Sequence, residues 1–159
     1  NVDEKAIHED NDYVKAVREF AADEDARVLK LSGKLEAEIA ALETEEERRE
    51  FLADAGLEES GMNKLIHTGY EMLGLRTFFT AGPKEVRAWT FHEGARAPEA
   101  AGVIHTDFQR GFIKAEVYHC EDLFELGSEQ KVREAGRLRI EGKEYPVKDG
   151  DVMNFKFNV

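Results

Sequence analysis

The alternation of apolar and polar residues is clearest between residues 112 and 117, where it has the period of two that is typical of a half-buried strand. The expected faces are Phe112, Lys114 and Glu116 on one side and Ile113, Ala115 and Val117 on the other.

A short helix is predicted just before this strand. Pro98 suits a first helical position, because the N–H that proline lacks would have had no partner there. Val103 and Ile104 give the helix a short apolar face, and His105-Thr106-Asp107 ends it in a polar turn.

Five further segments combine β-branched or aromatic residues with flanking turn signals, which predicts strands. They are 77–80 and 86–91 around a turn at 81–84, 137–140 and 144–147 around the hairpin signal Glu141-Gly142-Lys143, and 152–157 after Asp149-Gly150-Asp151. The order of hairpin, helix, strand, short hairpin and final strand is that of a ubiquitin-like β-grasp. We therefore expect an α+β fold.

The first part of the chain has helical periodicity with one strand-like interruption. Residues 1–42 alternate helix, strand and helix, which indicates an α/β remnant whose sheet partners are missing. The expected elements are a helix from about Asn11 to Asp23-Glu24-Asp25 with the apolar stripe Tyr13, Val14, Val17, Phe20 and Ala21, a strand at 27–31, and helices at about 34–41, 44–56 and 60–73.

Charge divides the chain into two parts. The 159 residues carry a formal net charge of −12. Residues 1–60 hold 19 acids and 8 bases, whereas residues 61–159 hold 15 acids and 14 bases. We place a boundary between Ser60-Gly61 and Leu75. The acidic part should repel phosphate backbones, and the nearly neutral part can present a local basic patch.

The single cysteine, Cys120, excludes an internal disulfide and fits a reducing cytoplasm. No apolar run approaches the ~18–20 residues of a membrane span, and no signal peptide is visible, so we expect no membrane role. The chain opens on Asn1 without an initiator methionine, which favours a piece of a longer protein.

Two groups of residues invite a chemical interpretation. His105 and Asp107 can be read as an acid–base pair. We favour a helix end, where polar side chains bond free carbonyl groups, and so expect no catalytic residue.

His119-Cys120 can be read as a metal site, but adjacent residues rarely chelate one ion and no spaced Cys or His pair supports them. We therefore expect no metal.

Several separated blocks of the sequence recur together in one known family. The blocks are Ile104-His105-Thr106-Asp107-Phe108, Gly111-Phe112-Ile113, Glu141-Gly142-Lys143-Glu144-Tyr145, Asp149-Gly150-Asp151-Val152 and Phe155-Lys156-Phe157-Asn158-Val159. They resemble a TGS domain, and more narrowly the C-terminal domain of the YchF (Obg-like) ATPases, which are P-loop NTPases. The resemblance runs from about Met62 to the last residue. The resemblance implies three parts: a remnant of the nucleotide-binding domain at 1–60, a helical connection at 61–75 and a TGS β-grasp at 76–159.

The same resemblance gives a meaning to the start of the chain. In this family the base-recognition loop reads Asn-x-x-Glu where ordinary GTPases have Asn-Lys-x-Asp, and Asn1-Val2-Asp3-Glu4 matches it. Ser32-Gly33 falls where a second base-contacting loop would lie, although the family more often has a residue such as Ala after the Ser. The implied base-binding residues are Asn1, Val2, Glu4, Ser32 and Gly33.

The chemistry of the bases supports a change of nucleotide. Guanine offers two adjacent donors, N1–H and the 2-amino group, which an aspartate carboxylate accepts together. Adenine offers an N6 donor beside an N1 acceptor, and an ionised carboxylate only accepts. A glutamate is one methylene longer and is misplaced for guanine, so the resemblance implies ATP as the preferred nucleotide and GTP as the weaker one.

The phosphate-binding loop Gly-x-x-x-x-Gly-Lys-Ser/Thr does not occur in this sequence. In the family this loop and the Mg²⁺ ligands belong to an upstream segment, so ATP and Mg²⁺ are implied for the full-length proteins. The 159-residue chain alone is expected not to hydrolyse nucleotide.

The family's link to the ribosome implies a contact with ribosome or RNA through the TGS domain. The candidate contacts are Arg87, Lys114, Arg137 and Arg139, with an ordinary solvated surface as the alternative. Trp89, Phe78, Phe79 and Phe91 can stack on bases, but alternation sends half of them to the core. The competing function is a stand-alone β-grasp module that binds a protein without any nucleotide role.

Overall fold

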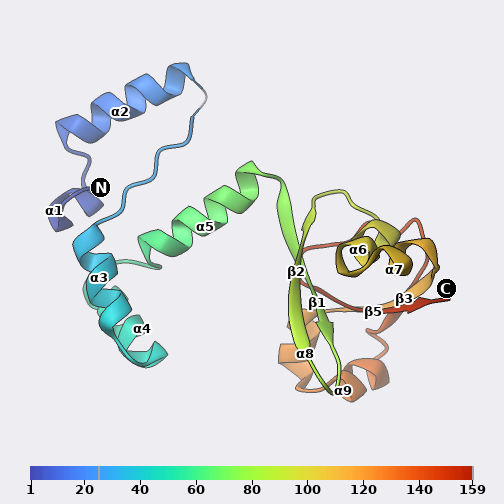
Figure 1. Ribbon diagram of the computed structural model, residues 1–159. Coiled ribbons are helices and arrows are strands. Elements are labelled where there is room, and N and C mark those ends of the chain that lie inside the picture. The colour runs from blue at the N-terminus through green and yellow to red at the C-terminus, as the bar shows by residue number, and fades with distance from the viewer. Residues whose placement is uncertain (25, 159) are drawn as a thin grey trace. The chain divides into compact units, whose positions relative to one another are not determined.

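The computed structural model describes residues 1–24 and 26–158. The chain forms two compact units, Asn1–Gly69 and Tyr70–Val159, and each is described by itself (Figure 1). Asp25, expected at the end of the first long helix, and Val159, the last residue of the TGS-like blocks, lie outside the described residues.

The first unit is helical. Its elements are α1 (Glu4–His8), α2 (Asp12–Asp23), α3 (Gly33–Ala41), α4 (Glu45–Asp54) and the greater part of α5 (Gly61–Met72). Thr44 and Glu47 form the capping box that starts α4. Asn11 caps α2 by accepting the N–H of Val14 at 3.0 Å.

The strand predicted at 27–31 is wrong. Residues 26–32 contain no strand. Ala26 and Ser32 bond to the neighbouring helices α2 and α3, and the described backbone bond that joins residues 27–31 to another segment runs from the N–H of Val2 to the carbonyl of Leu31 at 2.8 Å. The sequence has strand character, but a strand forms only where a second strand satisfies its backbone groups. Asn1–Asp3 supply a single contact of this kind.

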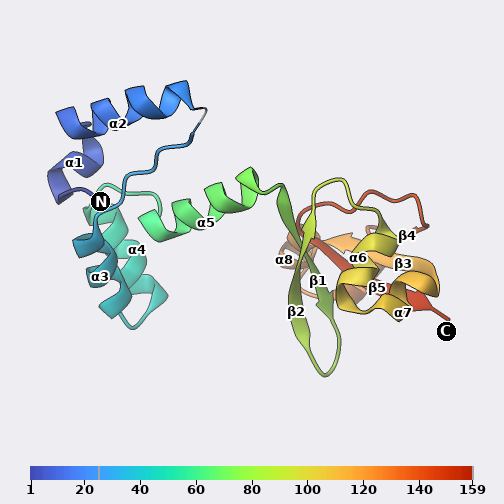
Figure 2. The same cartoon turned by 45° about the horizontal axis from the view of Figure 1, so that its top comes forward.

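The second unit is a mixed α+β structure around a five-stranded sheet (Figure 2). The strand order is β2-β1-β5-β3-β4, with β1 parallel to β5 and the other neighbouring strands antiparallel. The strands are β1 (Leu75–Ala81), β2 (Val86–His92), β3 (Phe112–His119), β4 (Arg139–Glu141) and β5 (Asp151–Phe157), and the helices are α6 (Ala97–Ile104), α7 (Thr106–Arg110), α8 (Cys120–Leu126) and α9 (Glu129–Glu134).

Helices pack on both faces of this sheet. The larger core lies under α6 and α7, where Phe78 is fully buried with its ring 5.9 Å from Phe91 and 5.8 Å from Phe155. A smaller cluster lies under α8 and α9, around Tyr118 and Val132. Phe78 and Phe91 are therefore core residues, as alternation predicts.

The predicted faces of β3 are wrong at its first residues. A register shift between Phe112 and Lys114 inserts one extra residue, so Phe112 is buried on the same side as Ala115 and Val117. Ile113 is 56% exposed. A bulge of this kind moves the preceding side chain to the other face, and strict alternation cannot reveal it.

The second predicted hairpin is also wrong. Residues 139–141 pair with β3, whereas residues 145–147 pair with residues 95–97, where α6 begins. The N–H of Ala97 donates to the carbonyl of Tyr145 at 2.9 Å, and the N–H of Val147 donates to Ala95 at 3.0 Å. Pro146 has no N–H to give to a ladder, which disfavours a regular strand there.

Four helices were not predicted: α1, α7, α8 and α9. The polar turn expected at His105-Thr106-Asp107 is the N-cap and first turn of α7. His119 and Ser128 cap α8 and α9 by accepting backbone N–H groups. Each of these helices has seven residues or fewer, too few to show a clear helical period.

Candidate base-binding pocket and basic surface

The two predicted base-contacting loops lie together in the first unit. The side-chain Oδ1 of Asn1 accepts the backbone N–H of Gly33 at 2.9 Å, which joins the first loop to the start of α3. Val2 is held by its backbone bond to Leu31. Ser32 is the N-cap residue of α3 and is only 2% exposed. All five predicted base-binding residues therefore lie around the same point.

Gly33 stands where the family resemblance implies a residue such as alanine, and the structure has room for either residue. A Cβ added there would lie 3.4 Å from Asn1 Oδ1, an ordinary van der Waals distance. An alanine at this position would fit beside the same Asn1 contact. The glycine therefore leaves the loop arrangement unchanged.

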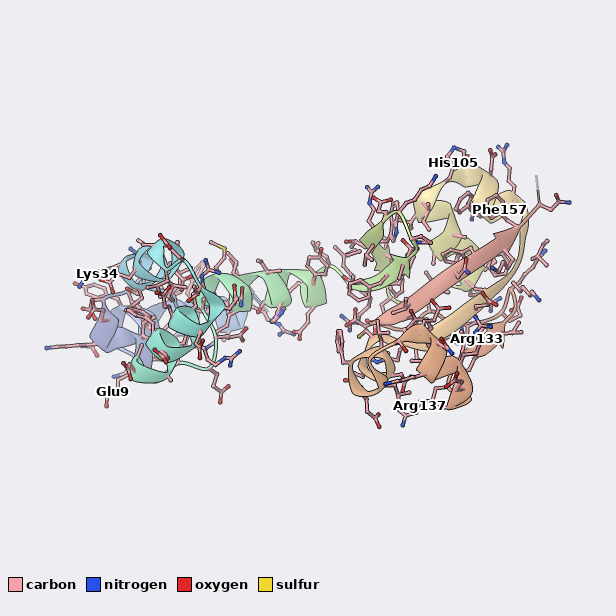
Figure 3. All side chains as sticks on the ribbon, turned by 90° about the horizontal axis from the view of Figure 1, so that it is seen from below. Glu9, Lys34, His105, Arg133, Arg137 and Phe157 are labelled. Carbon is pink, nitrogen blue, oxygen red and sulfur yellow. The ribbon has the colours of Figure 1, made fainter. Side chains whose placement is uncertain are left out.

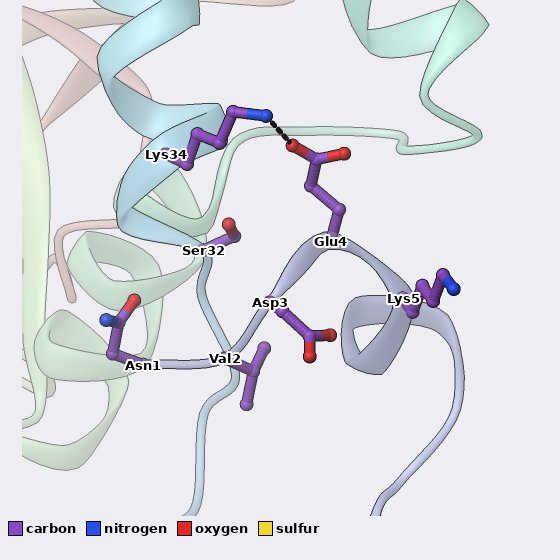
Figure 4. Close-up of a pocket in the computed structure, with 7 residues that line it drawn as sticks. All are labelled: Asn1, Val2, Asp3, Glu4, Lys5, Ser32 and Lys34. Carbon is purple, nitrogen blue, oxygen red and sulfur yellow. Dashed lines mark hydrogen bonds and ion pairs between the residues drawn. The ribbon is translucent and has the colours of Figure 1, made fainter.

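Glu4 does not face the pocket as a free carboxylate. Its Oε1 lies 2.5 Å from Lys34 Nζ, and this hydrogen bond raises the pKa of Lys34 (Figure 4). Asp3, between Asn1 and Glu4, caps α1 by accepting the N–H of Ala6 at 2.9 Å. The loop is thus fixed at Asn1, Asp3 and Glu4.

These residues line an open pocket of about 540 Å³, which Figure 4 shows with its lining residues Asn1, Val2, Asp3, Glu4, Lys5, Ser32 and Lys34. The pocket lining carries an amide, a hydroxyl, two carboxylates and two ammonium groups. Sequence reasoning missed Lys34, although its position directly after Ser32-Gly33 was a usable signal.

The pocket does not suit Mg²⁺. Magnesium prefers several oxygen ligands in octahedral geometry. Here Glu4 is already paired with Lys34, and Asp3 accepts a helix N–H. Among the described residues, no group of three or more His, Cys, Asp or Glu side chains is placed to hold a metal ion.

The sequence did not single out Glu36, which anchors the helix that leaves this unit. Its carboxylate accepts the N–H groups of Gly61 at 2.7 Å and Met62 at 3.2 Å. Ser60 adds a cap through its contact with the N–H of Asn63 at 3.1 Å. A carboxylate at a helix N-terminus is favoured by the helix dipole, so α3 holds the start of α5 firmly.

His105 and His119 have structural positions. Nδ1 of His105 accepts the N–H of Asp107 at 3.1 Å and so begins α7. Nε2 of His119 lies 2.9 Å from the carbonyl of Asp149. Burial raises the pKa of the Cys120 thiol, which disfavours the thiolate that metal binding requires.

The four predicted nucleic-acid contacts differ in how free their charges are. Arg137 is clamped by Glu125 at 2.6 Å and Asp122 at 2.8 Å, and these hydrogen bonds raise its pKa. Arg139 lies 3.1 Å from the hydroxyl of Tyr145 and 3.7 Å from the buried Asp151. Both guanidinium groups therefore already have partners within the fold.

Arg87 and Lys114 are more available. The Arg87 guanidinium lies 4.1 Å from the centre of the Trp89 ring, and its nearest carboxylate, Glu85, is 3.9 Å away. Lys114 is exposed on β3 and has no ion pair in the described part of the chain. Lys114 pairs in register with Lys156 of β5.

The Arg137 clamp predicts a specific dependence of stability on pH. Its hydrogen bond lowers the pKa of Asp122 below the ordinary value of 3.8. This ion pair stabilises the folded protein fully when the pH is above the pKa that Asp122 has in the unfolded chain. The stabilisation is lost as the pH falls through the lower pKa that Asp122 has in the folded protein. Arg137→Gln should therefore lower Tm at neutral pH and flatten the fall of Tm below about pH 4. Thermal melts of the parent and of Arg137→Gln across this pH range check the prediction, and Lys143→Gln is the control. Parallel curves of Tm against pH for Arg137→Gln and the parent would contradict it.

Comparisons with known proteins agree on one family. The family model YchF-GTPase_C, described as a protein of unknown function (DUF933), matches residues 75–158. "Ribosome-binding ATPase YchF" of Bacillus subtilis is 53% identical over 99% of this chain and 43% of the relative, and "Obg-like ATPase 1" of Homo sapiens is 46% identical over 99% and 40%. The solved structure of the Schizosaccharomyces pombe YchF GTPase has a TM-score of 0.81 and 35% identity, and the match covers 98% of this chain and 42% of that one.

The mixed α+β fold and the hydrogen bond that joins Asn1 to Gly33 thus occur in a sequence that matches the YchF family model. The chain belongs to the YchF family. It spans about 43% of the length of the curated relatives it matches. Within the described residues, we find no helix with the length and apolar character needed to cross a bilayer.

Proposed function

We propose that this chain is the C-terminal part of a cytoplasmic YchF-type ATPase. Residues 1–60 supply the base-recognition part of a nucleotide-binding domain, 61–75 form a helical connection, and 76–159 form a TGS domain with the ubiquitin-like β-grasp. The strand order β2-β1-β5-β3-β4, with β1 and β5 parallel at the centre, supports the β-grasp assignment.

The nucleotide part of the proposal rests on one observation, the hydrogen bond between Asn1 and Gly33 that joins the two loops. The proposed base-binding residues are Asn1, Val2, Glu4, Ser32 and Gly33. With Glu4 held by Lys34, its carboxylate is not free to accept both guanine donors, N1–H and the 2-amino group. Adenine lacks that pair of donors, so the pocket favours ATP over GTP.

Phosphate binding and hydrolysis belong to residues outside this chain in the proposal. When bound by the upstream part of such a protein, Mg²⁺ neutralises charge on the phosphates. The residues of this chain bind and orient the base, and the 159-residue polypeptide by itself is expected to show no turnover.

Glu4→Asp tests the base-recognition role. In a protein that joins this chain to the upstream part of the Bacillus subtilis relative, a shorter carboxylate should leave Lys34 and accept guanine donors. We expect the affinity for GTP relative to ATP to rise about tenfold, the size of one well-placed hydrogen-bonded contact. Competition binding of the two nucleotides measures the ratio.

Glu9→Asp is the matched control, because it makes the same chemical change outside the pocket (Figure 3 labels Glu9 and Lys34). An unchanged nucleotide ratio in Glu4→Asp, in a protein that still binds ATP, would reject the assigned role of Glu4.

The second part of the proposal is a contact with the ribosome, with RNA as the partner, through the second unit. The relatives named "Ribosome-binding ATPase YchF" support it. Arg87 and Lys114 carry most of the expected attraction, while Arg137 and Arg139 contribute less because carboxylates already hold them. Co-sedimentation with ribosomes at increasing salt tests it: phosphate contacts weaken steeply, whereas the alternative protein-binding module would lose affinity only slightly.

A further inference from the structure

Two lysines face each other across the middle of the sheet. Lys114 on β3 and Lys156 on β5 are direct cross-strand partners, and both are exposed. Directly opposite residues of an antiparallel pair project from the same face with Cβ atoms about 4.5–5.5 Å apart, and like charges in this arrangement destabilise the sheet.

The usual structural reason for lysines in a sheet does not apply here. Lysines often protect an edge strand from pairing with another chain. In the order β2-β1-β5-β3-β4, however, β3 and β5 are both interior strands. Lysine is also a poor strand former. The pair therefore works against the stability of the fold and protects no edge.

The charge around the lysines is only partly compensated. Glu116 on β3 is shared, with its carboxylate 3.3 Å from Lys156 and 3.9 Å from Arg133 of α9, and it also accepts a hydrogen bond from Asn154 at 3.0 Å. Arg133 has a second partner in Glu129 at 3.4 Å. Lys114 has no carboxylate within ion-pair distance in the residues that the structure describes. We call Lys114, Lys156 and Arg133 the sheet cation cluster.

The cluster lies on the face that α8 and α9 cover only in part. Tyr118 and Val152, at one end of β3 and β5, are buried under these helices, whereas Lys114, Asn154 and Lys156 at the other end are open. Figure 3 shows Arg133 and Arg137 on this side of the sheet and His105 on the other. The cluster contains no aromatic ring, so it offers cations without a surface for stacking bases.

We propose that the sheet cation cluster binds the sugar–phosphate backbone of RNA, with Lys114 and Lys156 on neighbouring phosphates. This inference rests on the ribosome contact proposed above and names the part of its surface that includes Lys114. Two flexible ammonium groups without enough carboxylates suit phosphate oxygens, and contacts of this kind position RNA without reading its sequence. A bound phosphate would relieve the repulsion that the pair imposes on the free protein.

The double variant Lys114→Gln/Lys156→Gln separates this role from a structural one. We expect binding of a fluorescein-labelled RNA hairpin to the 159-residue chain to weaken at least about tenfold, and the slope of log K against log salt to fall by about 1.5. Tm should stay the same or rise, because the repulsion is removed. A structural role would instead lower Tm. Fluorescence anisotropy and thermal melts supply the two readouts.

Lys84→Gln/Lys143→Gln is the matched control, since it removes the same charge from exposed turns of the same unit. Equal loss of RNA binding in the control would overturn the proposal in favour of a net-charge effect. Undiminished binding in Lys114→Gln/Lys156→Gln would also overturn it, while the proposed ribosome contact would stand. If the parent chain binds ribosomes but no RNA, the partner is a ribosomal protein and the cluster is misassigned. If it binds neither, the proposed function fails as well.

Discussion

Gly150→Ala is expected to lower the free energy of unfolding of the second unit by about 3 kcal/mol, from left-handed backbone strain and overpacking together. Gly150 has a φ of +81°, and a Cβ there would lie 2.6 Å from His119 Nε2 and 3.1 Å from Cys120 Sγ. The same residue connects three segments: its N–H donates to Thr77 at 2.8 Å, and its carbonyl accepts the N–H of Cys120 at 2.9 Å. The His119 ring cannot withdraw from the added Cβ without losing the 2.9 Å contact between its Nε2 and the carbonyl of Asp149.

Gly94→Ala provides the control for backbone strain alone. Gly94 has a φ of +85°, close to that of Gly150, but a Cβ there would meet nothing within 4 Å. Gly94→Ala should lower the free energy of unfolding by only about 1 kcal/mol, which is the cost of placing an alanine in the left-handed backbone conformation. Urea unfolding of both variants gives the difference. If the two substitutions cost the same, the clash with His119 is not a determinant of stability.

Local sequence signals predicted most of the second unit because its elements are locally consistent. β1, β2, α6 and β5 each show a clear period or turn signal, and all four are present near the expected residues. Apart from the short helices, the errors occur where a distant contact decides the structure. The bulge at Ile113 and the pairing of residues 145–147 with 95–97 both depend on neighbours far along the chain, and residues 27–31 lack the neighbour that their pattern calls for.

The residues of the candidate site could be predicted from the sequence, but most of the contacts between them could not. Asn1 and Ser32 could be paired only through the family resemblance, because 31 positions separate them and no periodicity links them. The ion pair between Glu4 and Lys34 and the opposition of Lys114 and Lys156 depend on the relative placement of separate segments. Residue type indicates which groups carry charge, but not which partner neutralises each of them.

Asp151→Ala is expected to destabilise the second unit by about 3 kcal/mol, because it removes the acceptor of two hydrogen bonds from a fully buried position. The side chain of Asp151 is 0% exposed, and its Oδ2 accepts the Tyr145 hydroxyl at 2.8 Å and the N–H of Lys148 at 2.9 Å. Arg139 approaches the other oxygen at 3.7 Å. These contacts hold the segment between β4 and β5 against the sheet, so the loss of the Asp151 carboxylate should loosen this segment.

Tyr145→Phe isolates one of these bonds and should cost about half as much, since Asp151 keeps the N–H of Lys148. Burial and the hydrogen bond to Asp151 raise the pKa of Tyr145 above its ordinary value of 10.0. In Asp151→Ala the second cause is removed, so the pKa of Tyr145 should fall, which an NMR titration of its ring can follow. Chemical denaturation of the two single variants and the double variant gives the coupling between them. Additive losses, or an unchanged Tyr145 titration in Asp151→Ala, would show that the buried carboxylate does not organise this segment.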